Sequence, residues 1–114
     1  MGSPAAGSIV LVPFPFSDLS QTKLRPAVVL AHIGRRDMIL CQVTSQAYGD
    51  RLAIALDDAS FAQGSLSRQS YVRPGKLFTA HETLIVSQPA RLRTEALSRI
   101  VDVIVSILKS VEKA

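Results

Sequence analysis

The sequence has little cysteine and few aromatic residues: Cys41 is its only cysteine, tryptophan is absent, and aromatic residues make up 5% of it. A single cysteine excludes an intramolecular disulfide and a metal site of the CxxC type, and it favours a reducing compartment. The longest apolar stretch, residues 100–108, contains Asp102 and Ser106 and is far shorter than the about 20 residues of a membrane-spanning helix. The sequence also opens without a charged-then-apolar leader. We therefore expect a cytoplasmic protein that makes no contact with a membrane.

The length of 114 residues suits one domain with a modest core and leaves no room for two. With 47% hydrophobic and 19% charged residues, the composition is typical of a folded globular protein. We expect residues 1–6 to be a flexible tail and residues 7–114 to be the single domain. The net charge of +4 and the pI near 9.7 favour polyanions such as nucleic acids. A surface on which bases stack would have to come from Phe14, Phe16, Tyr48, Tyr71 or Phe78.

Short apolar runs separated by glycine and proline predict a small, strongly bent antiparallel sheet or barrel. The predicted strands are residues 9–14, 27–33, 38–44, 52–56, 70–73 and 77–79, with a further candidate at 83–86. A single helical turn is expected within residues 57–63. From Thr94 onward, apolar residues recur at helical spacing and predict one amphipathic helix at the C-terminal end. The sequence therefore predicts a mainly β fold with a C-terminal helix.

Arg25 and Pro26 are predicted to be the first residues of a strand. The residue before a proline favours extended backbone, and proline has no N–H for a strand ladder. Gly34 and Arg35 fit a two-residue turn that places Arg25 opposite Thr44, whereas a three-residue loop would place Arg25 opposite Ser45. In either register a guanidinium and a hydroxyl meet at the open end of a hairpin, with Cβ atoms roughly 5 Å apart. This is a candidate anion site.

Three segments carry a resemblance to a known family. Ile9-Val10-Leu11-Val12-Pro13-Phe14-Pro15-Phe16 is followed by Lys23-Leu24-Arg25-Pro26-Ala27-Val28-Val29-Leu30 and then by Val43-Thr44-Ser45-Gln46. This order resembles the PemK/MazF family of bacterial toxins, with the Arg-Pro strand as the most specific motif. The segment from Ser70 to Leu77 and the terminal helix fit too, although Gly7-Ser8 stands where the family often has Gly-Asp. The resemblance covers residues 7–110 and implies a small SH3-like β-barrel of the PemK/MazF type, like that of CcdB.

The resemblance also implies a function, that of the toxin of a type II toxin–antitoxin system. Such a protein is a sequence-selective endoribonuclease that cleaves single-stranded RNA, such as mRNA, with no metal or other cofactor. The 2′-OH attacks the adjacent phosphate and leaves a 2′,3′-cyclic phosphate and a 5′-OH end, so the enzyme must orient that attack and stabilise charge. The resemblance assigns the main catalytic role to Arg25, and it assigns to Thr44 a hydrogen bond that holds the phosphate. The expected partners are the RNA, a cognate antitoxin and a second copy in a homodimer.

Polar residues around this pair are candidates for RNA binding. The loop that follows Phe14 is expected to cover a binding groove. Side chains just beyond Thr44 are suited to reading base edges, and basic residues beside Pro74-Gly75 suit backbone phosphates. The candidate contacts are Ser17, Asp18, Lys23, Ser45, Gln46, Arg73 and Lys76. A solvated polar loop explains each of them equally well.

Several alternatives stay open at this point. Arginine is a poor proton donor or acceptor because its pKa exceeds about 12, so the general base is unassigned. His32 and His81 could act as a pair, but His32 lies roughly 20 Å from Arg25 along its strand. The chain could instead be a non-catalytic barrel that binds nucleic acid or protein. A toxin that inhibits gyrase, as CcdB does, would need a C-terminal aromatic anchor, and residues 110–114 contain none.

Overall fold

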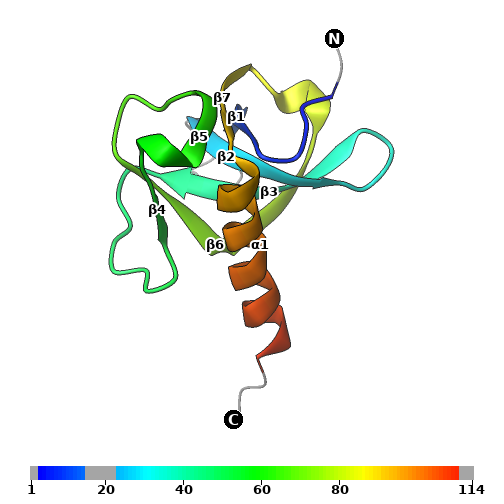
Figure 1. The fold of residues 1–114 in the computed structure, drawn as a ribbon. Coiled ribbons are helices and arrows are strands. Elements are labelled where there is room, and N and C mark those ends of the chain that lie inside the picture. The colour runs from blue at the N-terminus through cyan, green and yellow to red at the C-terminus, as the bar shows by residue number, and fades with distance from the viewer. Residues whose placement is uncertain (1–2, 15–22, 111–114) are drawn as a thin grey trace.

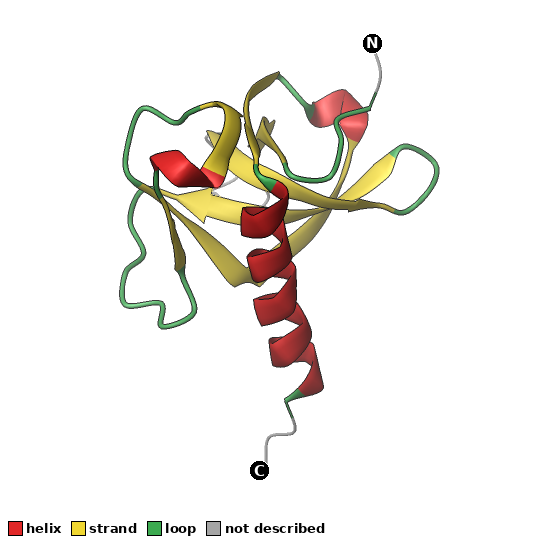
Figure 2. Cartoon of the chain, viewed as in Figure 1, coloured by secondary structure: helices red, strands yellow, loops and turns green. Residues whose placement is uncertain are grey.

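The computed structural model of the chain describes residues 3–14 and 23–110. This part forms a nearly closed antiparallel barrel of seven strands with one α-helix at its C-terminal end (Figures 1 and 2). The predicted mainly β fold with a C-terminal helix is therefore confirmed. Neighbouring strands follow the order β4-β6-β3-β2-β1-β7-β5. The elements are β1 Ser8–Pro13, β2 Leu24–His32, β3 Asp37–Thr44, β4 Ile54–Leu56, η1 Asp58–Ser60, β5 Phe61–Gly64, β6 Ser70–His81, η2 Glu82–Leu84, β7 Ser87–Leu92 and α1 Thr94–Lys109.

The hairpin of β2 and β3 has a three-residue loop, so the predicted two-residue turn is wrong. The N–H of Ile33 donates to the carbonyl of Asp37 at 3.0 Å, and positive φ angles at Gly34, Arg35 and Arg36 reverse the chain. The extra loop residue is compensated within β2. The register shifts by one residue between Val29 and Ala31, which is the signature of a β-bulge. Beyond the bulge, the strands pair in the register that the two-residue turn had predicted.

The second half of the sheet differs from the sequence-based prediction. Residues 70–73 and 77–79 belong to one continuous strand, β6. Its pairing with β3 jumps from Val72 opposite Val43 to Leu77 opposite Cys41. Residues 73–76 therefore form a bulge without ladder partners on β3, where a proline costs no hydrogen bond. The candidate strand at 83–86 is wrong, because Glu82–Leu84 is a 3₁₀ turn and the next strand is Ser87–Leu92.

Two hydrophobic clusters occupy opposite faces of the central strands, because successive strand residues point to opposite faces. On one face, Ile9 and Val28 belong to the cluster that includes Ile100 and Ile104 of α1. Helix α1 crosses this face and continues beyond the barrel (Figure 1). On the other face, Ala27, Val29 and their neighbours form a second cluster that contains Phe14. Since side chains alternate, Arg25 of β2 shares the second face with Ala27 and Val29.

The N-terminal residues that the structure describes lie against the barrel. Pro4 is buried, and its carbonyl accepts a hydrogen bond from His32 Nε2 at 2.6 Å. Gly7 adopts a φ of +94°, and its N–H donates to the carbonyl of Val29 at 2.8 Å. These contacts join the segment that precedes β1 to the edge of β2. Within the described residues, no helix has both the length and the apolar character needed to cross a bilayer.

Candidate functional site

The site is built on one row of residues that crosses the sheet at the open end of the β2–β3 hairpin. Arg25 pairs with Val12 of β1, and Thr44 pairs with Tyr71 of β6. Tyr71 in turn pairs with Ala55 of β4. Residues that are directly opposed in an antiparallel pair lie on the same face, with Cβ atoms about 5 Å apart. The row therefore gathers side chains from distant segments on one surface.

The register of β2 and β3 points the two predicted catalytic residues toward the same row. The last ladder pair between these strands is Ala27 opposite Gln42. Continuing that register by two residues places Arg25 opposite Thr44. The ladder ends at Ala27 because Pro26 has no N–H to donate, so Arg25 is held by β1 on one side only. Both side chains are partly buried, which leaves their polar groups within reach of a ligand.

The hydroxyl of Thr44 also organises the segment that follows β3. Its Oγ1 accepts a hydrogen bond from the N–H of Gln46 at 3.2 Å and donates one to the carbonyl of Gln46 at 3.1 Å. This local turn ends the strand and leaves Ser45 and Gln46 exposed. A hydroxyl has one proton and two acceptor sites. To donate to a phosphate, Thr44 must therefore release the carbonyl of Gln46, a short rotation of one O–H group.

An ion pair attaches the loop between β3 and β4 to strand β6. Arg73 Nε donates to Asp50 Oδ2 at 2.9 Å, and Asp50 Oδ1 accepts from the N–H of Leu52 at 2.9 Å. The hydrogen bond from Arg73, then that from Leu52, lowers the pKa of Asp50, with help from the nearby charge of Lys76. Arg73 and Lys76, both predicted to bind phosphate, thus lie beside the loop that carries Ser45 and Gln46. The Nε of Arg73 is engaged by Asp50, and its planar fork carries further N–H groups.

The remaining predicted residues are placed as follows. Lys23 is exposed, one residue before β2 begins, and its carbonyl accepts a hydrogen bond from the N–H of Phe14 at 3.2 Å. Lys23 is therefore two residues from Arg25, at the same end of the hairpin. Ser17 and Asp18 lie outside the described residues. Among those that are described, no three His, Cys, Asp or Glu side chains gather closely enough to hold a metal ion.

The two histidines are separated from Arg25. His32 is the last residue of β2 and donates to Pro4, whereas His81 accepts a hydrogen bond from the N–H of Thr83 at 3.2 Å. His32 pairs with Met38 and His81 with Asp37, so both lie at the turn end of β3. Arg25 lies at the other end, roughly 20 Å away at the rise of a β-strand. The pair of histidines that the sequence left open is thus not beside the Arg25 row.

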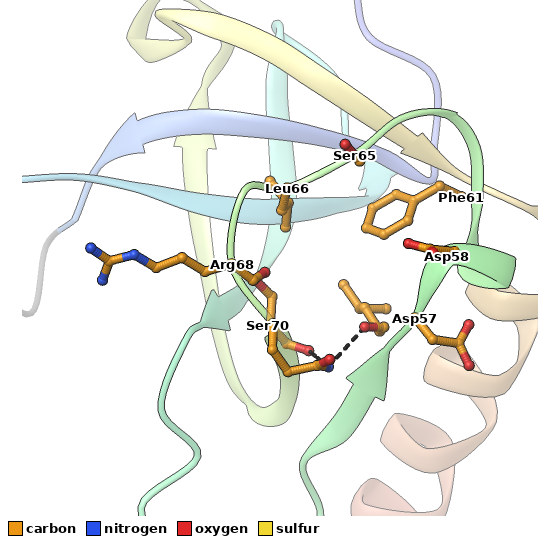
Figure 3. A pocket seen from close by; sticks show the side chains of 9 residues that line it. Asp57, Asp58, Phe61, Ser65, Leu66, Arg68 and Ser70 are labelled. Carbon is orange, nitrogen blue, oxygen red and sulfur yellow. Dashed lines mark hydrogen bonds between the residues drawn. The ribbon is translucent and has the colours of Figure 1, made fainter.

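A pocket opens on the face opposite to the row (Figure 3). Its wall includes Leu56 and Ser70, which pair with each other one position beyond Ala55 and Tyr71. Successive residues alternate between faces, so this pocket does not communicate with the row through the sheet. Figure 3 shows the Arg68 guanidinium pointing away from the other labelled side chains. The volume of about 190 Å³ is below the about 300–1,000 Å³ typical of small-molecule sites.

Tyr71 is the aromatic member of the row, and the sequence did not assign it to the site. The only signal for it was its place among the few aromatic residues. Its position beside Thr44 depends on the pairing of β3 with β6, which lie nearly thirty residues apart in the chain (residues 44 and 71). No local pattern in the sequence specifies that pairing. The tertiary structure alone brings this ring to the row.

Several solved structures have the same fold as this chain. MazF from Deinococcus radiodurans is 23% identical and superposes with a TM-score of 0.73, covering 96% of this chain and 100% of that one. A MazE–MazF complex from the same organism gives 21% identity, a TM-score of 0.75 and coverage of 96% and 100%. An endoribonuclease in complex with its cognate antitoxin, from a mycobacterial species, is 11% identical and superposes with a TM-score of 0.70, covering 99% of this chain and 100% of that one. The barrel is therefore that of the MazF toxins.

The family follows from the sequence itself. The model of the PemK-like, MazF-like toxins of type II toxin–antitoxin systems matches residues 5–108. That range is nearly the whole chain, and the chain belongs to this family. A search of curated proteins found none that matches the sequence. The resemblance identified from the Arg-Pro strand and the Thr-Ser segment is thereby confirmed.

Proposed function

We propose that the protein is a sequence-selective endoribonuclease that cleaves single-stranded RNA without a metal ion and leaves 2′,3′-cyclic phosphate and 5′-OH ends. Its membership of the toxin family supports this activity at the level of the class. The observation that carries the proposal is the β2–β3 register, whose last pair is Ala27 opposite Gln42; the same register extended by two residues aligns Arg25 with Thr44. A guanidinium and a hydroxyl on neighbouring strands can hold the two non-bridging oxygens of one phosphate.

In the proposed mechanism, Arg25 supplies the electrostatic part of catalysis. Attack of the 2′-OH on the phosphorus forms the cyclic phosphate and breaks the bond to the 5′ oxygen; the 2′-OH loses a proton and the departing 5′ oxygen gains one. The attack builds negative charge on the phosphate oxygens, and a positioned guanidinium stabilises that charge. Thr44 donates a hydrogen bond to the same phosphate and so fixes its orientation toward the attacking oxygen. Each residue is held by the strand on its outer side, Arg25 by β1 and Thr44 by β6. Ser45 and Gln46 extend from Thr44 toward the bases, while Lys23, Arg73 and Lys76 surround the row with positive charge.

The proposed partners are a cognate antitoxin and a second copy of the chain, in the cytoplasm. The net charge of +4 suits an acidic antitoxin segment, because complementary charge steers association. For the homodimer, the supporting feature is an apolar stripe on α1. Val101, Val105 and Leu108 lie at helical spacing and are all exposed, Leu108 by 73%. A second copy that covers this stripe would remove it from water.

The test is cleavage of a long single-stranded RNA in EDTA, with the ends mapped. We expect discrete cuts with 5′-OH ends for the wild type, a loss of about 10²- to 10³-fold for Arg25→Ala, and a smaller loss for Thr44→Ala. Thr44→Ser should restore most of the activity because it keeps the hydroxyl. Arg68→Ala is the matched control, since Arg68 is exposed and contributes to the pocket on the opposite face.

The outcomes separate catalysis from binding. Loss of cutting in Arg25→Ala but not in Arg68→Ala supports the assigned site. A folded, antitoxin-free wild type that cuts no RNA would contradict the ribonuclease function. RNA binding without cutting would instead make the Arg25–Thr44 pair a phosphate clamp, as in a non-catalytic barrel.

A further inference from the structure

Tyr71 lies beside Thr44 in the row. Thr44 is its partner on β3, and the small, exposed Ala55 is its partner on β4. The side chain of Tyr71 is partly buried. Within the described residues its hydroxyl has no hydrogen-bond partner. The backbone of Tyr71 is therefore held by strands on both sides, and its two partners in the row, Thr44 and Ala55, have small side chains.

The other aromatic side chains have different surroundings. Phe14 is 5% exposed and packs edge-on against Phe78, with ring centroids 4.9 Å apart. Tyr48 lies outside the strands, in the loop between β3 and β4, and is 81% exposed. Phe16 is outside the described residues. Of the five aromatic residues singled out in the sequence, Tyr71 is the one that the structure brings into the row of Arg25 and Thr44.

We infer that Tyr71 is a substrate-binding residue that stacks against a base of the bound RNA, next to the phosphate held by Arg25 and Thr44. This inference rests on the proposed ribonuclease function. Neighbouring strands are about 4.8 Å apart, so Arg25 on β2 and Tyr71 on β6 are separated by roughly 10 Å across β3. A phosphate beside Arg25 and Thr44 thus leaves its adjoining base over Thr44 or Tyr71. Stacking on an aromatic ring tolerates any base, which suits a position that binds without selecting sequence.

The experiment uses the protein's own tyrosine fluorescence, since the chain has two tyrosines and no tryptophan. Tyr48→Phe leaves Tyr71 as the only tyrosine, and Tyr71→Phe leaves Tyr48. Each variant is titrated with a 12-nucleotide 2′-O-methyl RNA whose sequence spans a mapped cut, and which cannot be cleaved because its 2′-OH is blocked. A dye-labelled sample of the same oligonucleotide reports binding by anisotropy. Stacking quenches tyrosine emission, so at saturating oligonucleotide we expect quenching in Tyr48→Phe and little change of emission in Tyr71→Phe.

A second pair of variants tests the contribution of the ring. Tyr71→Phe keeps the stacking ring, so we expect it to bind the oligonucleotide more tightly than Tyr71→Leu does. Tyr71→Leu keeps apolar bulk on the strand but loses the ring, and we expect its affinity for the same oligonucleotide to fall at least about fivefold, with KM affected more than kcat. Thermal unfolding of both variants checks that they fold.

The results distinguish the two proposals. Binding without quenching in Tyr48→Phe, or equal affinity of Tyr71→Phe and Tyr71→Leu, would overturn the assignment of Tyr71 and leave the ribonuclease function intact. No change of anisotropy with any folded variant would show that the row does not bind RNA, and both proposals would fail. Quenching through Tyr71 together with a selective loss in Tyr71→Leu supports the inference.

Discussion

The guanidinium of Arg73 and the carboxylate of Asp50 meet at 2.9 Å, with the two side chains exposed by only 25% and 15%. Arg73 lies in the bulge of β6, whereas Asp50 lies in the loop that continues from Thr44 to β4. This pair fixes the middle of the loop whose first residues are Ser45 and Gln46. It therefore couples the bulge of one strand to the predicted RNA-reading segment of another.

Removing the charge of Asp50 is expected to reduce stability in a pH-dependent way. The pKa of Asp50 lies below its ordinary value of 3.8 because Arg73 and the N–H of Leu52 hydrogen-bond to the carboxylate. The pair thus stabilises the fold above about pH 4, and this contribution is lost as the pH falls through the lowered pKa. We expect Asp50→Asn to cost about 1 kcal/mol at pH 7. Urea unfolding should show that the difference from the wild type shrinks toward pH 3, and a difference independent of pH would contradict this account.

The same pair allows loop positioning to be separated from phosphate binding. Arg73 can hold Asp50 through Nε and still bind a phosphate through its other N–H groups. Asp50→Ala should then weaken RNA binding without changing its dependence on salt. Arg73→Ala should weaken it further and reduce the slope of log affinity against log salt by about 1, the loss of one phosphate contact. Equal affinities and equal slopes for the two variants would mean that Arg73 acts only through the loop.

Arg25→Lys tests whether catalysis needs the shape of the guanidinium or only its charge. Lysine keeps the positive charge but loses the planar fork that matches two phosphate oxygens. We expect kcat to fall about 10²-fold with a small change in KM, because charge attraction to RNA is retained. Single-turnover cleavage measures this directly. A kcat close to that of the wild type would show that Arg25 only attracts the substrate.

Gly64 is expected to be among the least replaceable residues of the barrel. It has a φ of +64°, and a Cβ there would lie 2.2 Å from the carbonyl oxygen of Pro89. Gly64→Ala should therefore destabilise the fold by about 3 kcal/mol. Gly49 has a φ of +74° with nothing within 4 Å of such a Cβ, so Gly49→Ala should cost only roughly 1 kcal/mol. Urea unfolding compares the two variants, and equal losses would mean that the clash with β7 is relieved.

Cys41 is expected to be unreactive in the folded protein. Burial raises the pKa of its thiol to about 12, and Sγ donates to the carbonyl of Arg73 at 3.1 Å. Only the thiolate is a good nucleophile, so a thiol reagent such as Ellman's reagent at pH 8 should react at the rate at which the protein opens. When urea unfolds the protein, one equivalent of thiol should become reactive toward the reagent. Rapid reaction without denaturant would show that the reagent reaches Cys41 in the folded barrel and would contradict this expectation.

Local signals in the sequence predicted part of the fold around the candidate site correctly. Pro26 restricts the backbone before it and ends the ladder with β3, and that effect needs no distant contact. The helical spacing of apolar residues likewise predicted α1, since the period of 3.6 is a local property. The register that places Arg25 opposite Thr44 was also predicted, although from a turn that is wrong. The bulge after Val29 restores that register. The position of the bulge depends on how both faces of β2 pack, and the sequence of the turn does not specify it.

The sequence by itself thus determined the family, the start of β2, the terminal helix and the two residues proposed for catalysis. The tertiary structure decided what surrounds them. Strand β6 continues across Pro74 and Gly75 because the bulge opposite β3 removes the need for an N–H there. Asp50 meets Arg73, and Tyr71 meets Thr44, because strands distant in sequence pair in one particular register. Such pairings depend on which surfaces bury each other, and no window of neighbouring residues contains that information.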